Sequence, residues 1–146
     1  MRPFLLLSIG SLVLFGTVTF ALASLRQRSA PSGQTDIERG RYLVEEVAKC
    51  TECHTPRDAN NQLDPARWLQ GAATWIEPVH PVVSWAEFAP SIAGLVGITD
   101  EQAQRVLEMG VGLEGKSIQP PMHLYHLNHA DAQAVIAYLR SLPPRR

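Results

Sequence analysis

The two cysteines of this 146-residue chain lie in one short motif, Cys50-Thr51-Glu52-Cys53-His54. The pattern C-x-x-C-H is typical of c-type haem attachment. Both thiols then form thioether bonds to the vinyl groups of one haem, and the histidine that follows them is delivered to the iron as an axial ligand. The motif therefore predicts one haem c, covalently bound through Cys50 and Cys53, and it predicts electron-transfer chemistry.

Three other uses of the two cysteines fit the sequence less well. A redox dithiol is expected within a βαβ pattern, and no such pattern surrounds the motif. Tetrahedral zinc needs four ligands, so a zinc site would depend on His123, His126 or His129 from far downstream. A disulfide would close a strained small loop and would leave His54 without a role. The haem interpretation is preferred because it uses both thiols and the histidine at once.

An uncharged, apolar stretch occupies residues 3–25, directly after Arg2. As a helix it would be about 34 Å long, which is enough to cross the hydrocarbon core of a bilayer. We interpret residues 1–26 as an N-terminal membrane anchor, because the stretch is longer than the apolar region of a usual signal peptide. A signal peptide cleaved at about Ala23, in an A-x-A-like site, is the alternative. Either interpretation takes the rest of the chain across a membrane.

The chain after this stretch is mildly acidic. From Gln34 onward it holds all 14 acidic residues but only 10 of the 13 basic ones. No cluster of Lys or Arg indicates a nucleic-acid surface, so we expect no nucleic-acid partner. The excess of acidic residues is too small to identify a docking partner by its charge.

Capping signals indicate where the helices begin. Residues 27–34 form a polar linker that contains Ser, Pro and Gly. Thr35 and Glu38 then have the form of a capping box, and apolar residues recur at helical spacing up to Lys49. We therefore predict a first helix that leads directly into the cysteine motif, in a domain that spans residues 35–146.

Two further helices are predicted near the C-terminus. Thr99 and Gln102 form a second capping box, and the helix that follows ends at Gly110. Asn128 is a favourable N-cap for a last helix, which Pro143 stops. The last helix has an apolar stripe of Ala132, Val135, Ile136 and Leu139. The sequence as a whole predicts an all-α fold with long loops around the haem.

The segment 55–89 is the hardest part of the sequence to interpret. It holds four prolines and all three tryptophans of the chain. Prolines at this density favour loops and short turns, and a small hairpin is an alternative. Tryptophan is more often a packing residue than a catalytic one. We assign this segment no role from the sequence.

An electron-transfer haem needs a ligand on the second face of the iron. Met122 follows Pro120 and Pro121 in an irregular loop before the last helix, and a thioether ligand raises the redox potential. The alternative for any methionine is a gap-filling core residue, which is how we interpret Met109. Met1 lies in the N-terminal segment and is not a candidate.

Histidines near Met122 are rival ligands. His123 is adjacent to Met122, His126 lies slightly further along, and either would give a bis-histidine site with a lower potential. Met122 is preferred because Met/His ligation is typical of cytochromes c. We expect His80 in a surface loop and His129 exposed at the first turn of the last helix.

Residues 37–142 resemble a class I cytochrome c. The resemblance rests on five stretches in order: Arg39-Gly40-Arg41-Tyr42-Leu43, then Cys50 to Thr55, Pro90-Ser91-Ile92-Ala93-Gly94-Leu95, Pro120-Pro121-Met122, and Ala134 to Leu142, which ends in Tyr-Leu-Arg-Ser-Leu. The cysteine motif is highly specific, and the last two stretches are fairly specific.

The resemblance implies a role for each site residue. Cys50 and Cys53 carry the thioethers, and His54 and Met122 are the axial iron ligands. Pro90 matches the proline whose carbonyl accepts a hydrogen bond from the second ring nitrogen of the axial histidine. Such a bond fixes the tautomer of the imidazole and raises its basicity.

The resemblance also covers helix packing, and it has two departures. Gly40 matches the small residue that lets the first helix cross the last one closely, against Tyr138. The segment 55–89 is longer than its usual counterpart in the small cytochromes. Many membrane-associated relatives have proline after the ligand methionine, whereas this chain has His123.

These features predict an electron carrier and not an enzyme. Because bacterial relatives receive their haem outside the cytoplasm, we expect the haem domain on the periplasmic side, either anchored or soluble after cleavage. The expected partners are redox proteins or subunits of a respiratory complex. The alternatives are a cytochrome subunit of a multi-subunit dehydrogenase or oxidase, a haem enzyme or sensor with an open iron face, and a structural metal domain.

Overall fold

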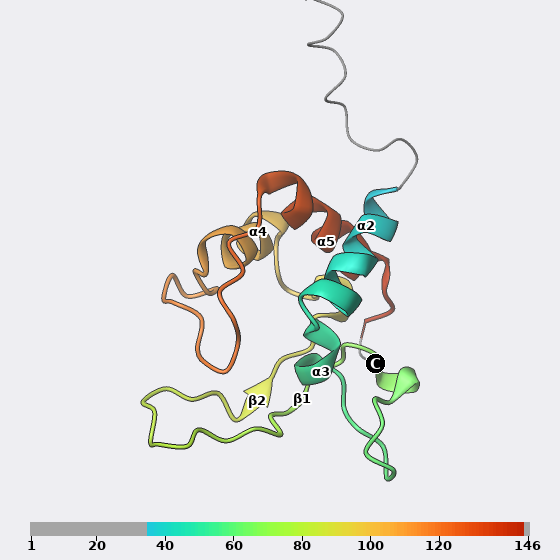
Figure 1. The fold of residues 1–146 in the computed structure, drawn as a ribbon. Helices are drawn as coiled ribbons and strands as arrows, with labels where there is room; N and C mark the ends of the chain where they lie inside the picture. Colours follow the sequence, from blue (N-terminus) through green and yellow to red (C-terminus); the bar gives the residue numbers. More distant parts are fainter. Residues whose placement is uncertain (1–34, 145–146) are drawn as a thin grey trace, which may run out of the picture. The chain divides into compact units, whose positions relative to one another are not determined.

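Short helices joined by long loops make up residues 35–144, the part of the chain that the computed structural model describes (Figure 1). The α-helices of this part are α2 (Asp36–Tyr42), α3 (Cys50–His54), α4 (Asp100–Met109) and α5 (His129–Ser141). Two single-turn 3-10 helices occupy Pro65–Arg67 and Ala93–Leu95. The expectation of helices with long loops is confirmed. Within the segment 55–89, β1 (Ala72–Ala73) pairs antiparallel with β2 (Phe88–Ala89), in agreement with the alternative of a small hairpin.

The predicted N-terminal segment, 1–26, and the linker, 27–34, lie outside the described residues. Within residues 35–144, no helix combines the length and the apolar character that crossing a membrane requires.

Helices α2 and α5 cross closely at the centre of the fold (Figure 1). A Cβ atom on Gly40 would lie 1.9 Å from the carbonyl oxygen of Ala134 and 2.8 Å from Cβ of Tyr138. Only glycine therefore fits this position, as the sequence indicates. The buried core beside the crossing consists mainly of Leu43, Val44, Val135, Ile136 and Leu139.

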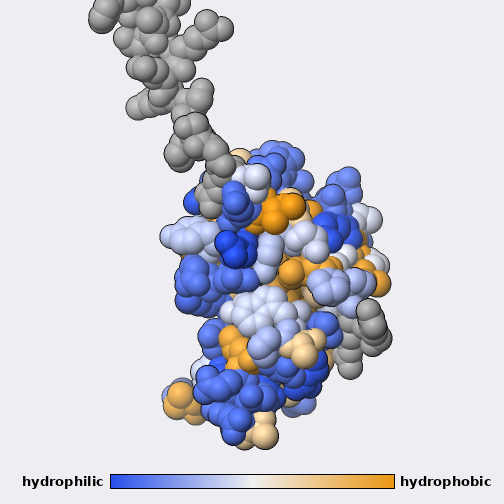
Figure 2. Space-filling model, turned by 90° about the vertical axis from the view of Figure 1, so that its right-hand side faces the viewer, coloured by the Kyte–Doolittle hydropathy of each residue, from blue (hydrophilic) through white to orange (hydrophobic). Residues whose placement is uncertain are grey.

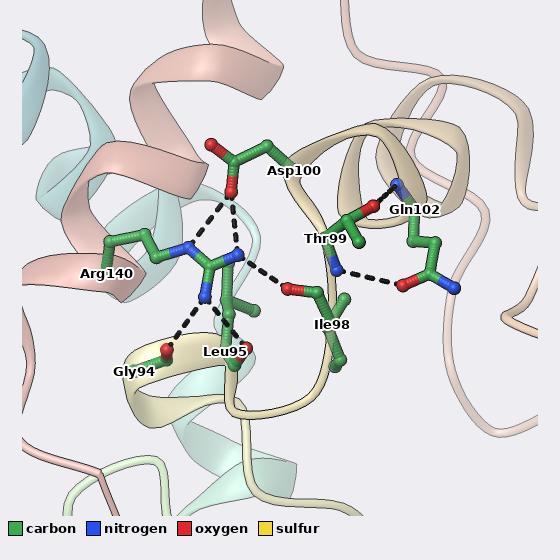
Figure 3. Close-up of polar contacts among 7 residues, drawn as sticks. All are labelled: Gly94, Leu95, Ile98, Thr99, Asp100, Gln102 and Arg140. Atoms are coloured by element: carbon green, nitrogen blue, oxygen red, sulfur yellow. Dashed lines mark hydrogen bonds and ion pairs between the residues drawn. The ribbon is translucent and has the colours of Figure 1, made fainter.

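Side-chain caps begin the helices where the sequence predicts them. Thr35 and Thr99 each form a complete capping box at the start of α2 and α4, and the second one is visible in Figure 3. The side chain of Asn128 accepts a hydrogen bond from the backbone N–H of Asp131, at 2.9 Å, and caps α5. The caps satisfy backbone donors that the first turn of a helix leaves free.

The first helix ends earlier than predicted. α2 stops at Tyr42, and the chain continues as a π-helix, η1 (Leu43–Val47), instead of running as an α-helix to Lys49. The N–H of Ala48 then bonds to the carbonyl of Leu43 at 2.7 Å, a wider turn than in an α-helix. Lys49 follows with φ of 52°, a left-handed conformation that turns the backbone into α3.

Arg140 of α5 ties the chain after Pro90 to the last helix (Figure 3). Its guanidinium donates to the carbonyls of Gly94 at 3.1 Å and Leu95 at 2.8 Å, and also to the carbonyl of Ile98. Two further bonds, of 2.9 and 2.7 Å, reach one carboxylate oxygen of Asp100. Gly94 and Leu95 have φ of 71° and 46°, so this side chain holds a turn that contains a left-handed leucine.

We predict that Arg140→Lys destabilises the protein by about 1–2 kcal/mol, because hydrogen bonds of this kind contribute roughly that much and an ammonium cannot reach the same set of acceptors. The control is Arg105→Lys on α4, an exposed arginine whose side chain makes no hydrogen bond within residues 35–144. Urea unfolding of the holoprotein measures both changes. Equal unfolding midpoints for the two variants would contradict this account of Arg140.

Candidate cofactor site

One helical turn, α3, carries all three residues of the cysteine motif. The left-handed Lys49 begins this turn, and the backbone leaves the helix again at Thr55. Cys50 and Cys53 are free thiols of intermediate burial. His54 is only 6% exposed. The two thiols and the imidazole therefore sit on one short, rigid segment.

A hydrogen bond joins His54 to Pro90, 36 residues further along the chain. The ring nitrogen Nδ1 lies 2.7 Å from the Pro90 carbonyl oxygen. Because a carbonyl only accepts, Nδ1 carries the proton and Nε2 keeps its lone pair. Burial lowers the pKa of His54, more strongly than the Pro90 bond opposes the change. The side chain is thus a neutral imidazole with Nε2 free to bind a metal.

Contacts between the segment after His54 and the segment around Pro90 hold this pair together. The N–H of Gly71 donates to the His54 carbonyl at 2.8 Å, and the N–H of Leu69 donates to the buried hydroxyl of Thr55 at 3.0 Å. Gly71 has φ of 85°, and a Cβ there would lie 2.9 Å from Ala89 O and 3.0 Å from the Pro90 carbonyl carbon. Sequence reasoning missed Thr55, Leu69 and Gly71, although a glycine between two apolar runs signals such a turn.

The environment of the thiols argues against two of the alternatives, the redox dithiol and the zinc site. Burial raises the pKa of Cys50 to about 11, and burial followed by the charge of Glu52 raises the pKa of Cys53. A redox dithiol needs the opposite shift, because the thiolate is its reactive form. Among residues 35–144, no three His, Cys, Asp or Glu side chains gather closely enough to hold a metal ion, so the downstream histidines do not complete a zinc site with the motif.

An apolar cavity of about 230 Å³ borders Cys50. It is lined by Leu43, Val47, Ala48, Cys50, Leu107, His123, Tyr125, Leu127 and Val135. The residues present fit a covalently bound haem: two free thiols on one turn, a neutral imidazole with a free Nε2, and an apolar cavity beside them. The thiols would form the thioethers, and the imidazole would supply one iron ligand.

Pro120 and Pro121 form the centre of a turn that Met122 ends, and His123 follows this turn. Met122 is half-buried, and its N–H donates to the Gln119 carbonyl at 3.2 Å. His123 is exposed, yet it lines the cavity beside Cys50, and its ring packs edge-on against Tyr125 with centroids 5.3 Å apart. Met122 is not among the residues that line this cavity. The structure thus brings His123 to the cavity and leaves Met122 beside it.

The remaining histidines and Met109 lie away from the motif. His126 is exposed, and its Nδ1 is 3.3 Å from the Glu108 carbonyl of α4. His80 is exposed, and His129 is an exposed first residue of α5, as expected. The interpretation of Met109 as a core residue is wrong, because its side chain is 61% exposed. It ends α4 on the side away from the core.

Comparison with known proteins gives three matches. The sequence model of the family described as Cytochrome c matches residues 37–143. The fructose dehydrogenase cytochrome subunit of Gluconobacter japonicus is 32% identical over 120 residues, which cover 75% of this chain and 23% of that protein. A diheme cytochrome c-type protein of Cereibacter sphaeroides is 59% identical over 34 residues, which cover 23% of this chain and 12% of that protein. The chain spans less than a quarter of the length of either relative.

Proposed function

Because the chain belongs to the cytochrome c family, whose members carry covalently bound haem c, we propose that it transfers single electrons through one haem attached at Cys50 and Cys53. The observation that carries this proposal is the hydrogen bond between His54 Nδ1 and the Pro90 carbonyl, which leaves Nε2 free on the same turn as two free thiols. In this proposal the chain is a carrier and catalyses no reaction of its own.

When bound, the haem supplies a reversible Fe(III)/Fe(II) couple. The residues of the chain provide the surroundings. Cys50 and Cys53 fix the cofactor to α3, and His54 offers Nε2 as one axial ligand. The Pro90 carbonyl keeps the imidazole in one orientation and raises its basicity. The cavity beside Cys50 offers a mainly apolar lining.

We assign the second axial position to Met122 rather than to His123 or His126. Met122 is half-buried, whereas both histidines are exposed: His123 lines the cavity at its edge, next to Tyr125, and His126 faces the Glu108 carbonyl of α4. The turn of Met122 is also held, because the N–H of Ala86 donates to the Pro120 carbonyl at 2.7 Å.

We predict that Met122→Ala lowers the redox potential, on the order of 0.1 V or more within the roughly 0.8 V that axial ligands span. Loss of the thioether also opens one iron face, so carbon monoxide binds the ferrous protein readily. Redox titration and carbon monoxide binding of the holoprotein measure both effects.

His123→Ala is the matched control for Met122→Ala and is expected to keep the wild-type potential. The reverse pattern, in which His123→Ala shifts the potential and Met122→Ala does not, would show that the histidine is the ligand. A wild-type protein that binds carbon monoxide readily would favour the haem enzyme or sensor.

The proposed location is the periplasmic side of a membrane, with residues 1–26 as the anchor. The uncharged stretch at 3–25 supports this proposal by its length. Cleavage at about Ala23 would instead release a soluble periplasmic protein. The proposed partners in both cases are redox proteins or respiratory complex subunits.

A second candidate function is that of a cytochrome subunit in a membrane-bound dehydrogenase or oxidase. It is supported by the similarity to a fructose dehydrogenase cytochrome subunit and by the loop between β1 and β2. The loop projects from the domain (Figure 1), and Val79 and Val83 within it are 92% and 91% exposed. By contrast, hydrophobic residues on the face drawn in Figure 2 form separate spots among hydrophilic ones.

The base of this loop is tied to the haem-attachment turn, and the rest of it is held only weakly. The indole N–H of Trp75 donates to the carbonyl of Glu52 in α3 at 3.1 Å, and Thr74 pairs with Glu87 at the base. Between residues 76 and 85 no backbone hydrogen bond ties the described loop to the rest of the domain. A partner that covers the two valines would thus bind a loop whose base is hydrogen-bonded to α3.

We predict that Val79→Ser with Val83→Ser releases the full chain from a larger complex while the haem spectrum and potential stay at wild-type values. Size-exclusion chromatography of detergent-solubilised membranes from the source cells measures the release. Val96→Ser, at a valine that is 70% exposed elsewhere, is the control and is expected to stay in the complex. A wild-type chain that elutes alone would sink this candidate and would favour the free carrier.

A further inference from the structure

The chain between Met122 and α5 has no regular secondary structure, and hydrogen bonds to α4 and to Ala48 hold it in place. The N–H of Leu127 donates to the carbonyl of Leu107 at 3.0 Å, which attaches the segment to α4. The hydroxyl of Tyr125 donates to the carbonyl of Ala48 at 2.9 Å, across a sequence separation of 77 residues. The second contact is the one that joins the Met122 segment to the chain just before the cysteine motif.

Ala48 is a suitable acceptor because of the way the first helix ends. It follows the π-helix η1, and the next residue, Lys49, is left-handed. The last carbonyls of a helix have no donor within the helix, so they need one from elsewhere. Tyr125 supplies such a donor two residues before Cys50. The bond therefore ends at the point where the backbone turns into the haem-attachment turn.

The ring of Tyr125 is half-buried in the cavity that Cys50 also lines. It lines the apolar cavity beside Cys50 together with Leu43 and Leu107, and His123 packs against its edge. The ring is thus placed by packing, and the hydroxyl adds one directed bond between two segments. A substitution by phenylalanine therefore removes the hydrogen bond and keeps the packing of the ring.

We propose that Tyr125 is a positioning residue whose hydroxyl clamps the Met122 segment to the haem-attachment segment and so keeps Met122 on the iron. The inference rests on the proposed function, in which Met122 is the second axial ligand. Tyr125 lies three residues after Met122, so a bond at Tyr125 limits how far Met122 can move. Without the bond, the segment keeps its contact with α4 but can swing away from α3.

The test compares Tyr125→Phe with wild type in the full-length holoprotein. Carbon monoxide binds at the second axial position of the iron only when Met122 has left it. The rate of carbon monoxide binding therefore reports the fraction of protein in which Met122 is dissociated. Loss of one hydrogen bond is expected to raise this fraction, and the rate, about two- to tenfold. The methionine-to-iron charge-transfer band of the ferric protein is expected to disappear at a lower temperature.

Tyr42→Phe is the matched control, because Tyr42 is 49% exposed on α2 and its hydroxyl has no partner among the described residues. Equal carbon monoxide rates and equal band-loss temperatures for Tyr125→Phe and Tyr42→Phe would overturn the proposal, even if Tyr125→Phe were less stable to urea. If wild type already binds carbon monoxide as fast as Met122→Ala, both this inference and the ligand assignment fail. The comparison of the two tyrosine variants thus tests the role of Tyr125 alone, and the comparison of wild type with Met122→Ala tests the ligand assignment.

Discussion

The hydrogen bond between His54 and the Pro90 carbonyl is the interaction on which the rest of the site depends. It decides which ring nitrogen carries the proton, and so it decides which one can bind iron. The bond also joins the two ends of a long loop, because residues 55–89 lie between His54 and Pro90 in the sequence. Thr55, Leu69 and Gly71 hold this loop through backbone contacts that leave no room for a side chain at Gly71.

The helical frame fixes the position of this closed segment. α2 and α5 cross at Gly40, where the carbonyl of Ala134 occupies the space of a side chain. Arg140 then extends from α5 to the turn at Gly94 and Leu95, a few residues after Pro90. Arg140 therefore links the crossing of α2 and α5 to the segment that contains Pro90, whose carbonyl orients His54. The Met122 side has a separate connection to α3, through Tyr125.

Local signals in the sequence predict much of this structure. The caps at Thr35, Thr99 and Asn128 begin helices where expected, because capping depends on residues three positions apart. The C-x-x-C-H motif and the resemblance identify His54 and Pro90, which the structure brings together.

Some of the parts that sequence reasoning missed depend on contacts between distant residues. The Tyr125–Ala48 bond joins segments 77 residues apart, and no local pattern in the sequence encodes it. The π-helical end of the first helix is local, but the sequence pattern of residues 43–47 does not distinguish it from an α-helix. Met109 was predicted as core because it is apolar and helical, but the last turn of α4 faces solvent there. The short β1–β2 pair was not missed, because a small hairpin is the alternative predicted for the segment 55–89.

The central claim is an iron held by one imidazole and one thioether on this scaffold. X-ray absorption at the iron edge of the wild-type holoprotein tests it most directly, because it identifies the atoms bound to iron without any substitution. The account predicts one sulfur in the first coordination shell, with nitrogen in the other positions. A shell of nitrogen alone would contradict it and would assign the second axial position to a histidine.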